Sequence, residues 1–145
     1  MEILIKSWKE AEADAFLVRQ EVFIQEQGVP AELELDEFDL SAVHVLAYQD
    51  KHCIGTGRLV NLSDQQSQIG RMAVLAKFRR KGVGKQVLQK LVDLAASKGA
   101  QEIILHSQVS ALPFYEKLGF QAQGDVYDEA GIPHRNMMLT LANSD

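Results

Sequence analysis

The chain is poor in the residues that mark several special classes of protein. It has one cysteine among 145 residues, so no disulfide can form within it and nothing points to an oxidising compartment. Its 3 prolines and 10 glycines exclude a collagen-like or linker-dominated chain. Apolar residues make up 46% and charged residues 24%, which is the composition of a globular domain that buries a core. We therefore expect a single domain over residues 1–145.

Long apolar runs and an excess of basic residues are also missing. No stretch approaches the ~18 consecutive apolar residues of a membrane-spanning helix. Charged residues interrupt the start, so no signal-peptide core forms. The 20 acidic residues outnumber the 15 basic ones, and the net charge of -5 argues against a dedicated nucleic-acid binder. The sequence therefore predicts a cytoplasmic protein whose partners include neither a membrane nor a nucleic acid.

Hydrophobic periodicity predicts both strands and helices. Strands are expected at residues 2–6, 42–48, 52–60, 68–75, 102–107 and 134–141. Helices are expected from residue 7 to about 27, from 83 to the glycine at 99, and over 110–118. Ser7 and Glu10 are spaced as a capping box, and Ser110 is expected to cap the last helix. The acidic segment 31–41 is expected to be an irregular loop, and the element order predicts an α/β domain with a mixed sheet.

A glycine-rich, basic turn joins the strand at 68–75 to the helix that begins at Val83. Its sequence is Phe78-Arg79-Arg80-Lys81-Gly82-Val83-Gly84-Lys85. The two glycines let backbone N–H groups at a helix N-terminus approach an anion closely. Cations at such an end are unfavourable, by about 0.3–1 kcal/mol each, unless an anion offsets them. The turn therefore predicts a phosphate-binding loop, with a solvated basic turn as the alternative.

Two common phosphate motifs do not fit this turn. A P-loop needs Ser or Thr after Gly-Lys, and Gln86 stands there; a dinucleotide fingerprint needs a third glycine, which is missing at the required spacing. The pattern that fits is Arg-x-x-Gly-x-Gly at Arg79, Gly82 and Gly84. It resembles the pyrophosphate loop of the GNAT superfamily of acyl-CoA-dependent N-acyltransferases.

The resemblance extends over nearly the whole chain. Segments 71–75 (RMAVL) and 113–120 (PFYEKLGF) stand where that superfamily has them. Segments 18–30 (VRQEVFIQEQGVP) and 131–134 (GIPH) resemble the ElaA/YjcF-like branch. At 107–110 the chain reads SQVS, where the superfamily often has an asparagine. The resemblance implies a GNAT-like α/β (α+β) fold, with a mixed, mostly antiparallel sheet that is splayed at a central cleft and flanked by helices.

The resemblance also implies acetyl-CoA as the acyl-donor co-substrate, lying in that cleft. Its pyrophosphate would contact the backbone amides of the loop, and its pantetheine would pair with strand residues 72–74. The cofactor-binding residues implied are Met72, Ala73, Val74, Arg79, Arg80, Lys81, Gly82, Val83, Gly84 and Lys85. No metal is expected, because the histidines and Cys53 lack the paired spacing of a zinc site.

The implied reaction is direct transfer of an acetyl group to a primary amine on a small molecule or a peptide. Tyr115 matches the superfamily's tyrosine acid, and an aromatic core residue is the alternative. Residues assigned to the acceptor site are Glu26, Gln27 and His134. The general base is not identified by the sequence; the candidates are Glu21, Glu26, Asp36, Glu37, His44 and His134.

Two other functions stay open at this point. One is a catalytically weak CoA-binding sensor or interaction module of the same fold. The other is a nucleic-acid binder that uses the basic residues of 77–90. Acidic residues along 32–39 either favour a cationic acceptor or keep a loop soluble. The acyl-chain length and self-association into a homodimer are left undetermined.

Overall fold

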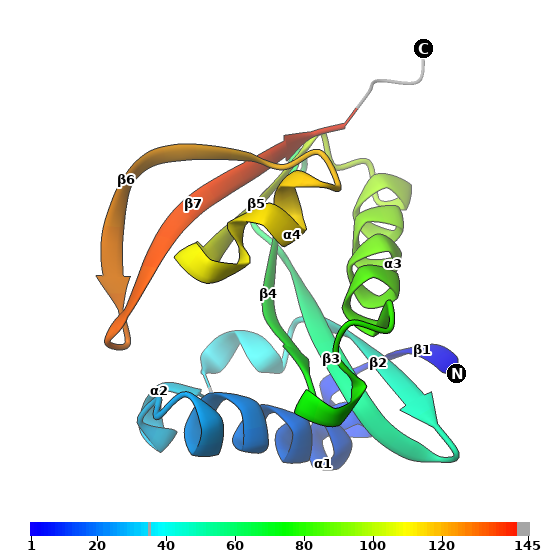
Figure 1. Ribbon diagram of the computed structural model, residues 1–145. Coiled ribbons are helices and arrows are strands. Elements are labelled where there is room, and N and C mark those ends of the chain that lie inside the picture. The colour runs from blue at the N-terminus through cyan, green and yellow to red at the C-terminus, as the bar shows by residue number, and fades with distance from the viewer. Residues whose placement is uncertain (35, 142–145) are drawn as a thin grey trace.

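The computed structural model describes residues 1–34 and 36–141, and its strands form one open sheet in the order β1-β2-β3-β4-β5-β7-β6 (Figure 1). The strands are β1 (Glu2–Lys6), β2 (Val43–Gln49), β3 (His52–Asn61), β4 (Gln66–Val74), β5 (Glu102–Gln108), β6 (Gln121–Glu129) and β7 (Ile132–Thr140). The α-helices are α1 (Trp8–Arg19), α2 (Ala31–Glu34), α3 (Val83–Ser97) and α4 (Leu112–Glu116). A π-helix η1 (Gln20–Glu26) and the 3-10 turns η2 (Glu37–Asp39), η3 (Ala76–Phe78) and η4 (Val109–Ala111) complete the elements. Only the β4–β5 pair is parallel among these strand pairs, so the predicted mixed, mostly antiparallel sheet is confirmed.

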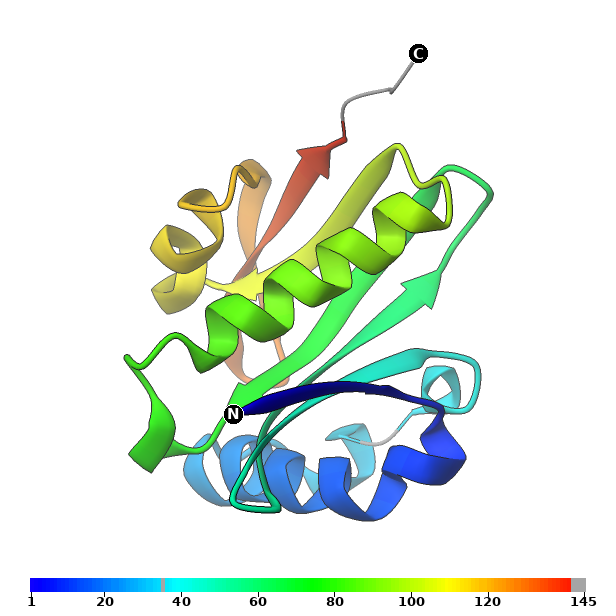
Figure 2. The same cartoon turned by 90° about the vertical axis from the view of Figure 1, so that its right-hand side faces the viewer.

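Helices cover both faces of the sheet. Successive residues of a strand point to opposite sides. In β2, Val45 and Ala47 therefore pack in the cluster that contains α3, whereas Leu46 and Tyr48 pack with residues of α1. Figure 2 shows α3 crossing in front of the strands and α1 lying below them. Each large apolar side chain buried in this way contributes about 1.5–3 kcal/mol to the free energy of folding, and these contributions hold both helices against the sheet.

A glycine in β3 sets how closely α3 approaches the sheet. A Cβ at Gly57 would lie 2.6 Å from Met72 Sδ and 2.8 Å from Leu91 Cδ1. Real Cβ atoms are not found at such distances, so a side chain at position 57 would force the Met72 and Leu91 side chains, or the elements that carry them, to shift. Because the basic turn is continuous with α3, Gly57 also helps to place that turn.

The first helix continues as a π-helix before it ends. The Glu10 carboxylate accepts hydrogen bonds from the Ser7 amide (3.4 Å) and the Ser7 hydroxyl (3.0 Å), so the predicted capping box is confirmed. After η1 the chain leaves the helix at Gln27, and Gly28 adopts φ 74°, as expected from the sequence. A π-helix is rare and frequently marks a functional site.

Three expectations about local structure are wrong. The sequence does not predict β6, because this strand (QAQGDVYDE) is polar, mostly exposed and without apolar alternation. Ser110 does not cap α4: it lies inside η4, and α4 begins after Ala111 with a proline in its first turn. The segment 31–41 is not irregular throughout, because it contains α2 and η2; residue 35 lies outside the described residues.

Candidate active site

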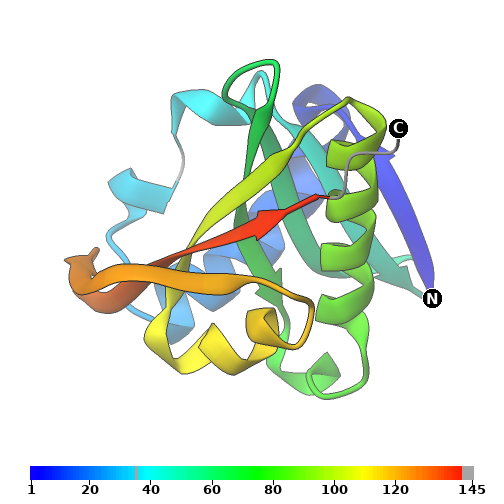
Figure 3. The same cartoon turned by 90° about the horizontal axis from the view of Figure 1, so that it is seen from above.

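A cleft opens where β4 and β5 separate. The two strands pair only where Gln66–Gln68 meets Glu102–Ile104, and they diverge beyond that point (Figure 1). The cavity between them has a volume of about 1250 Å³ and reaches from the start of α3 to the β6–β7 hairpin. Seen from above, that hairpin extends away from α3 (Figure 3). The predicted splay of the sheet is therefore confirmed.

The turn before α3 presents backbone donors to one end of the cleft. Arg80 and Gly82 both have left-handed φ angles, 63° and 84°. Gly82 is the N-cap of α3 and supplies no side-chain cap, so the first N–H groups of this 15-residue helix have no side-chain acceptor among the described residues. A Cβ on Gly82 would meet no protein atom within 4 Å, so the space beside it is open. Unpaired donors at the positive end of a long helix can hold an anion.

The residues assigned to acetyl-CoA from the sequence lie together along this end of the cleft, with one exception. Those that line it are Met72, Ala73, Val74, Arg79, Arg80, Gly82, Val83, Gly84 and Lys85. Lys81 is outside the lining formed by the described residues, and its ammonium lies 6.0 Å from the centre of the Phe78 ring. Ala73 and Val74 pair with β3 on one side, Met72 lies at a register shift of that pair, and β5 pairs with β4 no further than Gln68. The edge of β4 at 72–74 therefore faces the cleft and is able to pair with an extended, amide-rich molecule.

The guanidinium of Arg79 is hydrogen-bonded to β4 and to η1. Its Nε donates to the Val74 carbonyl at 2.9 Å, and its two Nη atoms donate to the Glu26 carboxylate at 2.7 Å each. These hydrogen bonds lower the pKa of Glu26. Glu26 lies outside the described lining of the cleft, so its charge serves to tie η1 to the turn that follows η3.

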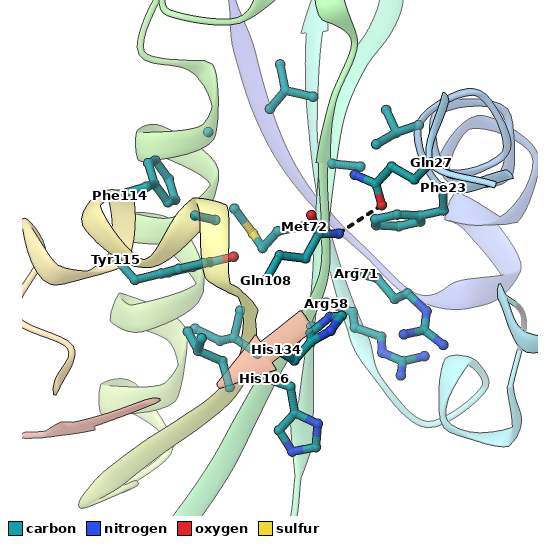
Figure 4. A pocket seen from close by; sticks show the side chains of 18 of the residues that line it. Phe23, Gln27, Arg58, Arg71, Met72, His106, Gln108, Phe114, Tyr115 and His134 are labelled. Carbon is teal, nitrogen blue, oxygen red and sulfur yellow. Dashed lines mark hydrogen bonds between the residues drawn. The ribbon is translucent and has the colours of Figure 1, made fainter. Parts of the chain in front are cut away.

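Tyr115 lies in the wall of the cleft formed by α4. Its ring is 8% exposed and packs edge-on against Phe114 and Phe120, at centroid distances of 5.0 and 6.0 Å. Figure 4 shows its hydroxyl oxygen pointing into the cleft, toward Met72 and Gln108. Burial raises the pKa of Tyr115, so the hydroxyl keeps its proton at neutral pH and gives it up less readily than an exposed tyrosine does.

The π-helix and β5 meet across the cleft. Gln108 Nε2 donates to Gln27 Oε1 at 2.8 Å, a contact that joins the end of β5 to the end of η1 (Figure 4). Gln27 and His134 both line the cavity, and both neighbour Gln108: Gln27 through this hydrogen bond, and His134 as its partner in the β5–β7 register. Of the three residues assigned to the acceptor site from the sequence, these two line the cavity, and Glu26 is not part of its described lining.

The candidates for the general base differ in whether they line the cleft and in whether an arginine holds them in an ion pair. Glu21 and Glu37 are exposed and lie outside the described lining of the cleft. His44 is 1% exposed beneath it, where its Nε2 lies 3.0 Å from the Asp39 carbonyl, and burial lowers the pKa of its imidazole. Asp36 lines the cleft but is held in ion pairs by two arginines. His134 is thus the candidate that lines the cleft without such an ion pair to an arginine.

Acidic residues of the segment 31–41 are neutralised by arginines from α1, β3 and β4. Arg19 donates to Glu34 and, at 2.8 and 3.0 Å, to Asp39; Arg58 donates to Asp39 at 2.9 Å. Arg58 also donates to Asp36 at 2.6 and 2.7 Å. Although burial by itself raises the pKa of Asp36, the hydrogen bonds and charges of the arginines outweigh it and lower that pKa. These described carboxylates therefore anchor the segment to the sheet.

Replacing Asp36 with asparagine should lower the free energy of unfolding by about 1–2 kcal/mol at pH 7, because the charged hydrogen bonds to the arginines are lost. The loss is limited because the Asp36 side chain is 28% exposed, and solvent weakens its ion pairs. The folded-state pKa of Asp36 is depressed, so its contribution is present above its unfolded pKa of about 3.9 and is lost as the pH falls through the folded value. Urea unfolding of both proteins at pH 7 and pH 3 measures the difference. Glu37→Gln, an exposed neighbour, is the control. A difference between Asp36→Asn and wild type that stays constant over this pH range would contradict the ion-pair explanation.

A polar cluster that the sequence did not indicate lies at the opposite end of the cleft from the turn. Glu129 at the end of β6 holds its Oε1 3.1 Å from His106 Nδ1 and its Oε2 3.5 Å from His134 Nε2. All three residues line the cavity. The only sequence signal was the turn Gly131-Ile132-Pro133-His134, because Glu129 and His106 lie in separate strands that pair through β7.

The described part of the chain contains neither a cluster of metal-ligating side chains nor a membrane-spanning helix. Its His, Cys, Asp and Glu side chains form no group of three or more that could hold a metal ion. The absence of a metal from the reaction stays a prediction. Within residues 1–34 and 36–141, no helix combines the length and apolar character needed to cross a membrane.

Comparisons with known proteins agree with this geometry. The family profile of the acetyltransferase (GNAT) domain matches residues 7–141. The uncharacterised N-acetyltransferase YjcF of Bacillus subtilis is 39% identical over 139 residues, which cover 95% of this chain and 99% of YjcF. The UPF0039 protein C11D3.02c of Schizosaccharomyces pombe is 33% identical over 131 residues, or 88% of this chain and 87% of that protein.

Solved structures show the same architecture. A Lactobacillus plantarum protein described as a candidate N-acetyltransferase superposes with a TM-score of 0.88 at 29% identity, covering 97% of this chain and 98% of that one. Escherichia coli ElaA superposes with a TM-score of 0.86 at 25% identity, covering 96% and 99% of the two chains. The splayed sheet, the turn before α3 and these relatives agree, and the chain belongs to the GNAT family of acetyltransferases, in the branch that includes YjcF and ElaA.

Proposed function

We propose that this acetyltransferase moves an acetyl group from acetyl-CoA to a primary amine of a small molecule or peptide, by direct attack while both substrates are bound. The observation that carries the proposal is the turn at Arg80–Gly82. It directs unpaired N–H groups of α3 into a cleft whose other wall is an unpaired strand edge. A diphosphate fits the first feature and a chain of amides fits the second. Acetyl-CoA contains both.

The reaction requires a neutral amine, a donor for the oxyanion and a proton for the leaving thiolate. A lysine-type amine has a pKa of about 10.4, so it must lose a proton at neutral pH before it attacks the thioester carbon. The amide near Val74, on the unpaired edge of β4, is the proposed donor to the oxyanion. Tyr115 is the proposed acid for the thiolate, because its protonated hydroxyl points into the cleft. Burial raises the pKa of Tyr115, and it would raise the pKa of a thiol beside it as well. The difference between the two pKa values, which decides proton transfer from Tyr115 to the thiolate, is therefore not made unfavourable by burial alone.

The test is release of free thiol from acetyl-CoA across a panel of primary amines, together with calorimetric titration of acetyl-CoA. We expect binding and amine-dependent thiol release. Binding without release for any amine would favour a catalytically weak sensor or interaction module. Salt-sensitive binding of DNA or RNA that excess acetyl-CoA does not displace would favour a nucleic-acid binder. No heat and no thermal protection from acetyl-CoA would contradict the proposal.

A further inference from the structure

The β6–β7 hairpin fixes the proton positions on His134. Nδ1 of His134 lies 2.7 Å from the carbonyl oxygen of Ile132, two residues earlier in the same strand. A carbonyl only accepts hydrogen bonds, so Nδ1 carries a proton whether the ring is neutral or charged. In the neutral ring, Nε2 is therefore the nitrogen with the free electron pair, and it is the one able to take up a proton.

The ring of His134 is held at the acceptor end of the cleft. His134 pairs with Gln108 of β5 in the sheet and is 7% exposed, yet it lines the cavity. The Tyr127 ring stacks on it at a centroid distance of 6.2 Å and an angle of 25°, which restricts its rotation. In Figure 4 the ring lies between Gln108 and His106, on the side of the cleft that Tyr115 faces.

Glu129 supplies a negative charge beside the basic nitrogen. Its Oε2 lies 3.5 Å from His134 Nε2, and its Oε1 lies 3.1 Å from His106 Nδ1 of β5. A carboxylate at this place attracts a cationic amine and stabilises the imidazolium after the proton has moved. The other titratable group against the ring is Tyr127 of β6. The charged groups Asp36, Arg58 and Arg71, which also line the cleft, belong to the ion-pair cluster under the segment 31–41.

We propose that His134 is the general base of the reaction, with Glu129 as the residue that positions and stabilises its charged form; this rests on the proposed acetyl transfer. His134 Nε2 takes one proton from the acceptor ammonium. The freed electron pair of the amine forms the C–N bond to the thioester carbon, and the carbonyl becomes an oxyanion. Collapse of the oxyanion breaks the C–S bond, and the thiolate takes the proton of Tyr115. The acceptor nitrogen still carries one excess proton after the C–N bond has formed, and this proton passes through water to the Tyr115 oxygen. The His134 imidazolium then returns its proton to the solvent.

The first experiment compares His134→Gln with wild type in the thiol-release assay. We expect the turnover number to fall about 10²- to 10⁴-fold at pH 7, the range typical of a general base, while the affinity for acetyl-CoA is unchanged. The acidic limb of the pH–rate profile should disappear in the variant. An α-amine acceptor has a pKa of about 7.7–8.0, so most of it is already neutral at pH 9. With such an acceptor, the difference in turnover between His134→Gln and wild type should therefore be smaller at pH 9 than at pH 7.

A matched control is available in the same chain. His52 also holds its Nδ1 near a carbonyl two residues earlier, 3.0 Å from the Asp50 oxygen, but it is exposed at the start of β3 and outside the described cleft lining. His52→Gln should therefore leave turnover unchanged. Glu129→Gln keeps the size of the side chain and removes its charge, so it should lower turnover less than His134→Gln does.

A second measurement does not depend on activity. Nitrogen chemical shifts of His134 in the wild-type protein should report a neutral ring protonated on Nδ1. A neutral ring protonated on Nε2, or His134→Gln turnover equal to wild type with an unchanged acidic limb, would overturn the assignment of the base and leave acetyl transfer standing. A wild-type protein that releases no thiol with any amine would overturn both.

Discussion

The Gly82→Val variant should bind acetyl-CoA at least about 100-fold more weakly than wild type, a loss of about 2.8 kcal/mol at 1.4 kcal/mol per factor of ten. A Cβ at this position meets no protein atom within 4 Å, so a valine would project into the open space beside the N–H groups of α3. In the proposed complex that space holds the pyrophosphate. The φ of 84° at Gly82 adds strain for any residue with a side chain, about 1–2 kcal/mol.

The other end of the same helix provides the control. Gly99 has φ 85°, and a Cβ there would also meet no protein atom within 4 Å. Gly99→Val therefore carries the same backbone strain at a position outside the described cleft lining. Calorimetric titration with acetyl-CoA should show normal affinity for Gly99→Val and a large loss for Gly82→Val, while both unfold at similar temperatures. Equal affinities in the two variants would mean that the turn does not hold the phosphates.

The Tyr115→Phe variant should release thiol about 10²- to 10⁴-fold more slowly than wild type and bind acetyl-CoA with unchanged affinity. Phenylalanine keeps the ring that packs against Phe114 and Phe120, so the wall of the cleft is preserved. Only the hydroxyl is lost, and with it the proton proposed for the leaving thiolate. Single-turnover rates with a saturating amine measure this step directly.

Tyr48→Phe is the matched control for removal of a buried hydroxyl. Tyr48 is 8% exposed like Tyr115, but it lies in the cluster with α1 and donates to Asp14 at 2.7 Å. Its replacement should lower stability by about 0.5–3 kcal/mol and leave the turnover number unchanged. A Tyr115→Phe turnover equal to wild type would assign Tyr115 to packing alone and leave another group to protonate the thiolate.

Local patterns in the sequence were sufficient to predict the elements that carry strong periodicity. The apolar stripe of α3 and the glycines beside Arg79 predicted a helix that begins with a glycine-rich turn, and both are present. That this turn holds an anion stays a prediction. Ser7 and Glu10 predicted the start of α1 correctly. Edge strand β6 could not be predicted in this way, because its side chains mostly face solvent and β7 supplies the backbone hydrogen bonds that define it.

The positions of acidic residues in the sequence did not predict which carboxylates carry an unpaired charge in the cleft. The acidic segment at 32–39 suggested either a cationic acceptor or a soluble loop, but Asp36 and Asp39 pair with arginines from α1, β3 and β4. Glu26 was expected at the acceptor site, and it pairs with Arg79. The partners are separated by many residues along the chain, so no local pattern indicated these pairs.

By itself, the sequence determined the family, the mixed sheet and the position of the glycine-rich turn before α3, because helix periodicity and the glycines of a turn act over a few neighbouring residues. The tertiary structure alone decided which polar groups share the cleft. Strand pairing brings His106, Glu129 and His134 together from three strands, and the register of β5 with β7 places His134 opposite Gln108. The physical reason is that a side chain's partners and its contact with water depend on segments that are distant in the chain, whereas its preferred backbone conformation depends on its neighbours.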